Sequence, residues 1–146
     1  MGVDVEVATV IARPQEEVAA FVVDPDNAPR WYANIDSVRR HDDGPVRVGT
    51  KMEFVARFLG RELVYTYEVV LYDPEDRLVM RTAEGPFPME TVYDWSRVGL
   101  GTRVRLRNRG EPSGFGRLAG PVVARAMKRA MTRDLARLKA LLESPA

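Results

Sequence analysis

The sequence predicts one α+β domain in which a curved antiparallel sheet wraps around a single long C-terminal helix. Three observations support this prediction. The length of 146 residues fits one domain, which we assign to residues 1–146. The middle of the chain is a series of β-rich runs separated by short turn sequences, and the final segment has helical periodicity. With 45% hydrophobic and 29% charged residues, the chain has the composition of a protein with a buried core.

The N-terminal part is expected to hold one strand and two short helices. In residues 3–11, valines alternate with acidic or small residues, as in a half-buried strand. A helix is expected to begin at Arg13-Pro14, because proline is favoured in the first turn of a helix. Asp24-Pro25-Asp26 ends this helix, and residues 27–31 are expected to form a second, shorter one.

Five further strands are expected to follow as a meander of hairpins. The breaks between them have compositions typical of turns. These breaks are Leu59-Gly60, Asp73-Pro74-Glu75-Asp76, Gly85-Pro86-Phe87-Pro88 and Gly99-Leu100. The strands that they delimit are residues 49–58, 61–72, 77–84, 89–97 and 102–109. A polar strand that ends near His41 brings the predicted sheet to seven strands.

The last segment, from about Phe115 to Glu143, is expected to form the long helix. Its apolar residues recur at spacings of three and four: Val123, Met127, Met131, Leu135, Leu138 and Leu142. Asp134 is expected at the edge of this stripe, paired with Arg137 or another basic neighbour. The remaining positions are rich in lysine and arginine, which is typical of a solvated face. The same basic helix could instead contact anionic surfaces weakly.

Charge patterning predicts the hairpin register and therefore the face of the sheet that lies inside. When residues are paired across the turns, opposite charges meet on one face, which is favourable in a sheet. The resulting pairs are Lys51–Glu68, Arg57–Glu62, Glu68–Arg81, Asp94–Arg105 and Glu90–Arg109. Because side chains alternate along a strand, this charged face is expected to be solvated and the opposite face to be covered by the helix.

The inner face is expected to carry polar groups among apolar ones. With Gly85–Pro88 as the loop, Thr82 pairs with Thr91. One row across the sheet is then Met52, Tyr67, Thr82, Thr91 and Asn108, and the next is Phe54, Tyr65, Glu84 and Met89. A buried polar group without a partner costs ~1–3 kcal/mol. These groups either bond to one another in a closed core or line a cavity and orient a ligand.

We favour the cavity, because ligand sites are mostly apolar with a few well-placed polar groups. The predicted ligand-binding residues are Met52, Phe54, Tyr65, Tyr67, Met80, Thr82, Met89, Thr91, Tyr93, Asn108, Met127 and Met131. The two methionines from the helix could adapt to varied ligand shapes, or they could simply fill the core.

The order of elements resembles that of the START-like (helix-grip, SRPBCC) superfamily, in its polyketide cyclase/dehydrase-like branch. The resemblance spans nearly the whole chain. Its motifs are Val10-Ile11-Ala12-Arg13-Pro14-Gln15-Glu16-Glu17-Val18, Asp24 with Asn27-Ala28-Pro29-Arg30-Trp31, Val48-Gly49-Thr50, Glu68-Val69-Val70-Leu71-Tyr72-Asp73-Pro74 with Arg77-Leu78, and Leu138-Lys139-Ala140-Leu141-Leu142-Glu143. It implies a helix-grip fold, a curved seven-stranded antiparallel sheet around the C-terminal helix.

The resemblance implies two alternative functions. One is binding of a small lipophilic molecule, lipid- or polyketide-like, between sheet and helix. The other is a cofactor-free polyketide cyclase or aromatase, for which Tyr67 and Tyr93 would donate hydrogen bonds and Glu84 would act as base. Glu84 would need a raised pKa for that role. Because it adjoins the Gly85-Pro86 turn, it is more simply explained as a solvated residue at the rim.

Composition argues against several other classes. There is no cysteine and a single histidine, His41, so we expect no disulfide, no metal site and no cofactor. A net charge of +1 gives no general attraction to nucleic acid. No apolar run approaches the ~20 residues that span a bilayer, and the N-terminus lacks a signal-peptide pattern. We therefore expect a cytoplasmic monomer or homodimer whose partner is a small hydrophobic ligand.

Overall fold

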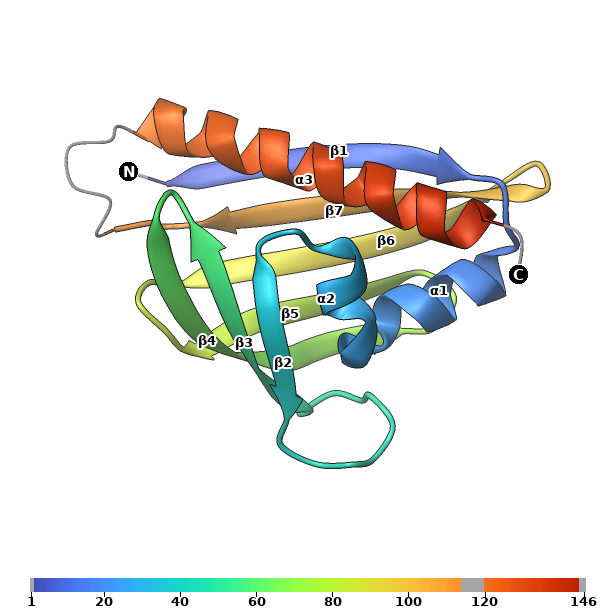
Figure 1. Cartoon of the computed structure of the whole chain (residues 1–146). Coiled ribbons are helices and arrows are strands. Elements are labelled where there is room, and N and C mark those ends of the chain that lie inside the picture. Colours follow the sequence, from blue (N-terminus) through green and yellow to red (C-terminus); the bar gives the residue numbers. More distant parts are fainter. Residues whose placement is uncertain (1, 114–119, 145–146) are drawn as a thin grey trace.

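The computed structural model describes residues 2–113 and 120–144, and it confirms the predicted α+β architecture. Seven antiparallel strands form one sheet in the order β1-β7-β6-β5-β4-β3-β2, and helix α3 lies across one face of it (Figure 1). The strands are β1 (Val3–Ile11), β2 (Ile35–Arg40), β3 (Lys51–Phe58), β4 (Arg61–Asp73), β5 (Arg77–Glu84), β6 (Met89–Val98) and β7 (Gly101–Gly110). The helices are α1 (Gln15–Val23), the single turn η1 (Pro25–Asn27), α2 (Ala28–Trp31) and α3 (Gly120–Glu143).

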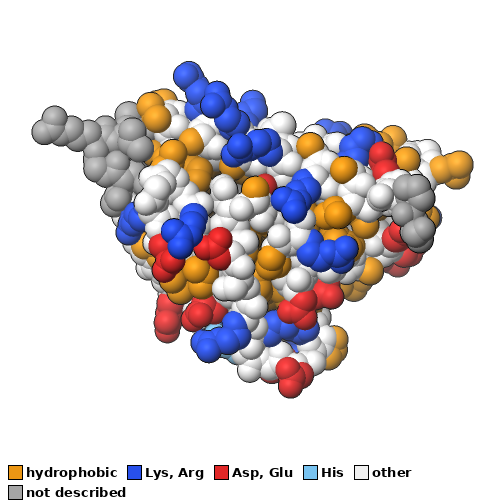
Figure 2. All heavy atoms as spheres, viewed as in Figure 1, with side chains coloured by type: hydrophobic (Ala, Val, Ile, Leu, Met, Phe, Trp, Pro, Cys, Tyr) orange, Lys and Arg blue, Asp and Glu red, His pale blue; other side chains and the backbone are white. Residues whose placement is uncertain are grey.

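Both predicted short helices are present, and the long helix is present from Gly120 onward. The start predicted for it at residue 115 lies outside the described residues. Among the helices of residues 2–113 and 120–144, none is long and apolar enough to cross a membrane. The basic face predicted for α3 is exposed, and Figure 2 shows Lys and Arg side chains along it.

Two hairpins are closed by tight turns whose backbone demands positive φ. Leu59 and Gly60 have φ of 51° and 76°, as the two central residues of a type I′ turn require. At the β6–β7 turn, Gly99 alone has positive φ, 59°, which suits the first central residue of a type II′ turn. These two turns occur where the sequence predicted them, and they set the register of the strands on either side.

The register predicted from charge is confirmed for every pair named. Lys51 lies opposite Glu68, and Glu68 lies opposite Arg81. The other predicted pairs, Arg57–Glu62, Asp94–Arg105 and Glu90–Arg109, are also formed. Away from two bulges, in β4 and β5, the strands of these hairpins therefore present the predicted faces, one charged and one toward α3.

The register predicted for the β5–β6 hairpin is wrong by two residues. Met80, and not Thr82, lies opposite Thr91. The observed register aligns Arg81 with Glu90, whose side chains form an ion pair of 2.6 Å. Pairing of opposite charges, which predicted the register of the other hairpins, would therefore have predicted the observed register of this hairpin too. A shift of two residues preserves which face each side chain occupies.

Beyond the paired residues of β5 and β6, the connection between the two strands is irregular. Thr82 is held not by Thr91 but by its neighbour across the turn, since its Oγ1 accepts from the Met89 backbone N–H at 3.0 Å. A bulge in β5 pairs Glu84 with Thr66, while Tyr67 pairs with Thr82. Because Thr66 lies between two inward-facing tyrosines, the bulge turns Glu84 toward the outer face.

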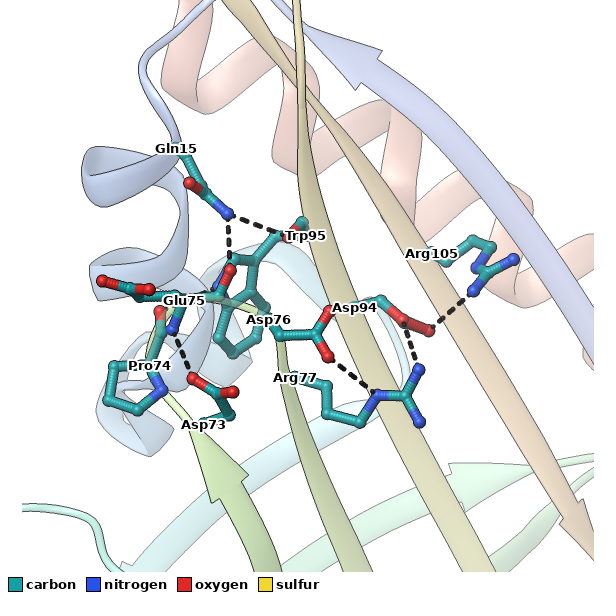
Figure 3. Close-up of polar contacts among 9 residues, drawn as sticks. All are labelled: Gln15, Asp73, Pro74, Glu75, Asp76, Arg77, Asp94, Trp95 and Arg105. Atoms are coloured by element: carbon teal, nitrogen blue, oxygen red, sulfur yellow. Dashed lines mark hydrogen bonds and ion pairs between the residues drawn. The ribbon is translucent and has the colours of Figure 1, made fainter.

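One end of the sheet is closed by contacts between α1 and the β4–β5 turn (Figure 3). The Gln15 side-chain amide donates to the backbone carbonyls of Glu75, at 2.6 Å, and Trp95, at 3.1 Å. The Trp95 indole N–H donates to the Pro74 carbonyl at 3.0 Å. Trp95 is fully buried, so its ring packs in the core at this end, and its indole N–H keeps a hydrogen-bond partner there.

Candidate ligand-binding cavity

A cavity of about 160 Å³ lies between the inner face of the sheet and the N-terminal half of α3. Most of its lining is apolar or aromatic. Of the predicted ligand-binding residues, those in the lining are Phe54, Tyr65, Tyr67, Met80, Met89, Thr91, Tyr93, Asn108, Met127 and Met131. The structure therefore brings these side chains together around one space. That they bind a ligand stays a prediction.

Two of the predicted ligand-binding residues do not reach this cavity. Met52 is on the inner face as expected, but it is 2% exposed and packs into the core with Phe54 and Trp31. Thr82 is held at the β5–β6 connection by its bonds to Met89. The sequence pattern correctly assigned both to the inner side, but it carried no information on how far the cavity extends along the strands.

The prediction that Glu84 lies on the inner face is wrong. Its side chain is exposed and lies on the outer side of the sheet, because the β5 bulge reverses its direction relative to Thr82. It is absent from the cavity lining, so it cannot act as the base of a reaction there. His41 is exposed in the segment after β2, as expected for a surface residue.

Two pairs of polar side chains are bonded to each other in the cavity wall. The hydroxyl of Thr91 donates to the side-chain oxygen of Asn108 at 2.6 Å, which confirms one of the cross-strand pairs expected. The hydroxyl of Tyr93 is 2.5 Å from that of Tyr32, the residue that follows α2. Among the described residues, none accepts from the amide nitrogen of Asn108, and the Tyr32–Tyr93 bond uses only one of the two phenol protons.

Burial keeps the tyrosines of the wall protonated. It raises the pKa of Tyr67 to about 12, although a hydrogen bond with Thr91 opposes the rise. Burial is also the main cause that raises the pKa values of Tyr65, Tyr32 and Tyr93 above the ordinary value. These phenols are therefore hydrogen-bond donors near neutral pH and not bases.

Among the described lining residues, Asp134 is the one with a carboxyl group, and the position predicted for it is wrong. It was expected at the edge of the helical stripe beside Arg137, but it is only 4% exposed and lines the cavity. Its Oδ1 accepts from the Ala33 backbone N–H at 3.1 Å. Burial raises the pKa of Asp134 to about 6, against the smaller lowering by that hydrogen bond and by Arg133 and Arg137.

The signal for Asp134 was present in the sequence. It lies three residues after Met131 and four before Leu138, which puts it on the stripe that packs against the sheet. Tyr32 gave no such signal, because it follows a four-residue helix with no periodicity of its own. Only the tertiary structure brings its hydroxyl to Tyr93.

The rim of the cavity carries Arg57, whose side chain is 66% exposed. Its guanidinium contacts two carboxylates, Asp36 at 2.9 Å and Glu62 at 3.4 Å. This end of the cavity therefore reaches the surface beside β2 and β3. Within the described part of the chain, no cluster of three or more histidine or acidic side chains is arranged to hold a metal ion.

Comparison with known proteins identifies the family. The sequence profile of the family described as polyketide cyclase/dehydrase and lipid transport matches residues 2–143, so the chain belongs to that family. Among curated proteins, none has a significantly similar sequence. The resemblance to the START-like superfamily is thereby confirmed. Family and fold indicate a protein of the hydrophobic-ligand-binding or polyketide-cyclase type.

Several solved structures share the fold at low sequence identity. TTHA0849 from Thermus thermophilus has a TM-score of 0.83 and 23% identity, over 95% of this chain and 96% of that one. The Zhui aromatase/cyclase from Streptomyces sp. R1128 has a TM-score of 0.81 and 16% identity, over 98% and 94%. A START superfamily protein from Mycobacterium smegmatis has a TM-score of 0.78 and 17% identity, over 96% and 97%. At these identities the likeness establishes the fold.

Proposed function

We propose that this member of the polyketide cyclase/dehydrase and lipid transport family binds one small lipophilic molecule in the cavity between the sheet and α3. The observation that carries the proposal is the cavity itself, about 160 Å³ in volume and mostly apolar, with a few polar groups in its lining. Sites for small molecules have this composition. An apolar protein cavity of roughly 150 Å³ accommodates benzene, so the expected ligand carries about one ring or a short branched chain.

The lining suggests how such a ligand is oriented. Its apolar body contacts Met127 and Met131 on one side and Phe54 on the other. Methionine side chains are flexible and polarisable, so they adapt to ligands of different shape. A polar atom of the ligand meets the opposite wall, where the amide nitrogen of Asn108 and the phenols of Tyr93 and Tyr32 offer hydrogen bonds.

The comparisons support a ligand of this kind. The family description includes lipid transport, and one protein of the same fold is named an aromatase/cyclase. Both names refer to molecules with apolar bodies. The burial of such a body contributes roughly 25 cal/mol for each Å² of apolar surface removed from water, which makes the cavity the main source of affinity.

The test is titration with an uncharged fluorescent probe of one ring, 4-(dimethylamino)benzonitrile, whose emission rises in apolar surroundings and whose size suits the cavity. We expect saturable binding to the unmodified protein and its loss in Met131→Trp, because the larger ring fills the cavity. The matched control is Ala136→Trp, which adds the same ring at an exposed position of α3. Circular dichroism checks that all three proteins are folded. Equal probe binding by the two tryptophan variants would exclude the cavity as the binding site.

A second candidate is cofactor-free cyclisation of a poly-keto substrate in the same cavity, and one observation favours it. The pKa of Asp134 is raised to about 6 by burial, which brings a carboxylate base close to working pH. In this hypothesis Asp134 removes a proton beside a ketone, and the phenol of Tyr93 or Tyr67 donates to the ketone oxygen. Product analysis with a synthetic poly-β-ketone tests it. Turnover that is lost in Asp134→Asn while probe binding persists would support catalysis, and absence of turnover in the unmodified protein would reject it.

A further inference from the structure

The charge inside the cavity is unbalanced. Asp134 is 96% buried, since its exposed fraction is 4%. One of its carboxylate oxygens accepts from the Ala33 backbone N–H. For the other oxygen, Oδ2, the residues that the structure describes provide no hydrogen-bond donor. No described basic side chain lies within ion-pair distance of Asp134, and its helical neighbours Arg133 and Arg137 are exposed on α3.

Among the described residues of the cavity lining, the one cation is already engaged. Arg57 lies at the rim, where Asp36 and Glu62 both contact its guanidinium. Two carboxylates on one guanidinium leave no positive charge with which to hold an anionic ligand. Within the described lining, the cavity therefore has a carboxylate without a counter-ion and no cation in excess.

The groups around Asp134 suit a cation. Tyr32, Tyr67 and Tyr93 line the same cavity as Asp134, and the N–H that bonds to Asp134 belongs to Ala33, the residue directly after Tyr32. Aromatic rings attract cations by their faces. The oxygens of the bonded Tyr32–Tyr93 pair each retain a lone pair that can accept an N–H.

We propose that the ligand of this cavity is a small lipophilic amine, bound as its ammonium ion with an N–H on Oδ2 of Asp134. This inference rests on the proposed function and specifies the head group of its ligand. A buried carboxylate is costly unless it is paired and hydrogen-bonded, and an ammonium supplies both the charge and the donor. Further N–H donors of the ammonium reach the phenol oxygens, while the apolar body lies against Met127 and Met131.

The same chemistry distinguishes this ligand from its alternatives. An anionic head would bring a second negative charge beside Asp134. A neutral ketone would offer only an acceptor, which the ionised carboxylate cannot use. An alcohol would offer one neutral donor, and hydrogen bonds between charged groups are roughly twice as strong as neutral ones. The volume of about 160 Å³ limits the body to about one aromatic ring with a short chain.

The experiment compares three ligands of similar size in displacing the one-ring probe 4-(dimethylamino)benzonitrile at pH 7. They are 2-phenylethylamine, which is protonated at this pH, 2-phenylethanol and phenylacetate. We expect the amine to bind about tenfold more tightly than the alcohol, and phenylacetate to bind most weakly. In Asp134→Asn, which keeps an oxygen for the Ala33 N–H, the preference for the amine should disappear while the alcohol is unaffected. Asp43→Asn, at an exposed acid, is the matched control.

The outcomes separate this inference from the proposed function. If the three ligands compete equally, or if Asp134→Asn keeps the preference for the amine, the amine is rejected and a binding cavity remains. If probe binding is insensitive to Met131→Trp, the cavity itself is rejected. If Asp134→Asn does not fold, the comparison of the three ligands in the unmodified protein still tests the inference. An alcohol that binds as tightly as the amine would overturn it.

Discussion

The two halves of the interface between α3 and the sheet are built differently. Toward the C-terminal end of α3, Leu135, Leu138 and Leu142 are buried and belong to a closely packed core. Toward the N-terminal end, the same helical stripe continues with Met127 and Met131 and lines the cavity. One face of one helix therefore serves packing over half its length and encloses a site over the other half.

The neighbouring elements explain the difference. At the packed half, α1 and the β4–β5 turn close the end of the sheet through Gln15 and Trp95 (Figure 3). At the cavity half, the β3–β4 hairpin curls toward α3 (Figure 1), and the wall is made of tyrosines, methionines and Asp134. A continuous apolar stripe on a helix therefore does not imply continuous packing. The curvature of the sheet sets the distance between sheet and helix that the side chains must fill.

Alanine substitutions on α3 should have the largest effects and should separate the two halves. Leu138→Ala is expected to lower the free energy of unfolding by about 4 kcal/mol, because it leaves a void in a packed core. Met127→Ala, in the partly buried cavity wall, should cost about 1 kcal/mol, because less apolar surface is lost from burial. Urea denaturation of both variants measures this contrast. Equal losses would mean that the two halves are packed alike.

Asp134→Asn should stabilise the protein in a manner that depends on pH. The folded-state pKa of Asp134 is raised to about 6, so its ionised form is disfavoured by folding. The free-energy cost of burying the ionised carboxylate is fully present above pH 6. It is lost as the pH falls through 6 toward the ordinary pKa of an aspartate, near 4. The variant should therefore be more stable by about 2–3 kcal/mol at pH 8, and the gain should vanish near pH 4. A gain that is independent of pH would contradict an ionised, buried Asp134.

Tyr93→Phe should have a smaller effect, confined to the cavity wall. It removes one partner of the 2.5 Å hydroxyl contact and leaves the buried Tyr32 phenol without that bond. The expected loss is about 1 kcal/mol in the free energy of unfolding. Tyr72→Phe is the control, because the Tyr72 hydroxyl makes no hydrogen bond to the described residues. Similar losses in both variants would show that the Tyr32–Tyr93 bond contributes nothing specific.

Glu68→Gln should have the smallest effect and gives the baseline for the outer face. Glu68 and Lys51 approach to 4.0 Å with both side chains partly exposed. Exposed ion pairs of this kind contribute ~0–1 kcal/mol. Thermal and urea unfolding should therefore change little. A loss of several kcal/mol would indicate that this face is buried, for example between two copies of the chain.

Much of the fold could be predicted because strands and turns leave local signals. Alternation assigned side chains to the two faces, and opposite charges selected the register of the β3–β4 and β6–β7 hairpins. The β5–β6 hairpin was misregistered because its loop was taken from the Gly85–Pro88 composition and not tested against Arg81 and Glu90. The register error by itself left the face assignments intact. Two bulges did not: one in β5 turns Glu84 outward, and one in β4 places Leu71, which alternation along its strand assigned to the inner face, opposite Val79 on the outer face.

Local patterns were therefore enough to predict the face that most strand residues occupy, the turns and the apolar stripe of α3. The faces and the stripe follow from repeats of two and of three to four residues, and the turns follow from their composition. Which of these residues enclose a cavity depends on how the sheet curves around α3. The curvature of the sheet sets whether Met52 packs in the core or lines the cavity. The spacing of Asp134 already places it on the inward stripe of α3, and the same curvature sets whether it meets a cavity there or a closed core. The contact between Tyr32 and Tyr93 joins residues 61 positions apart, a distance over which no local pattern carries information.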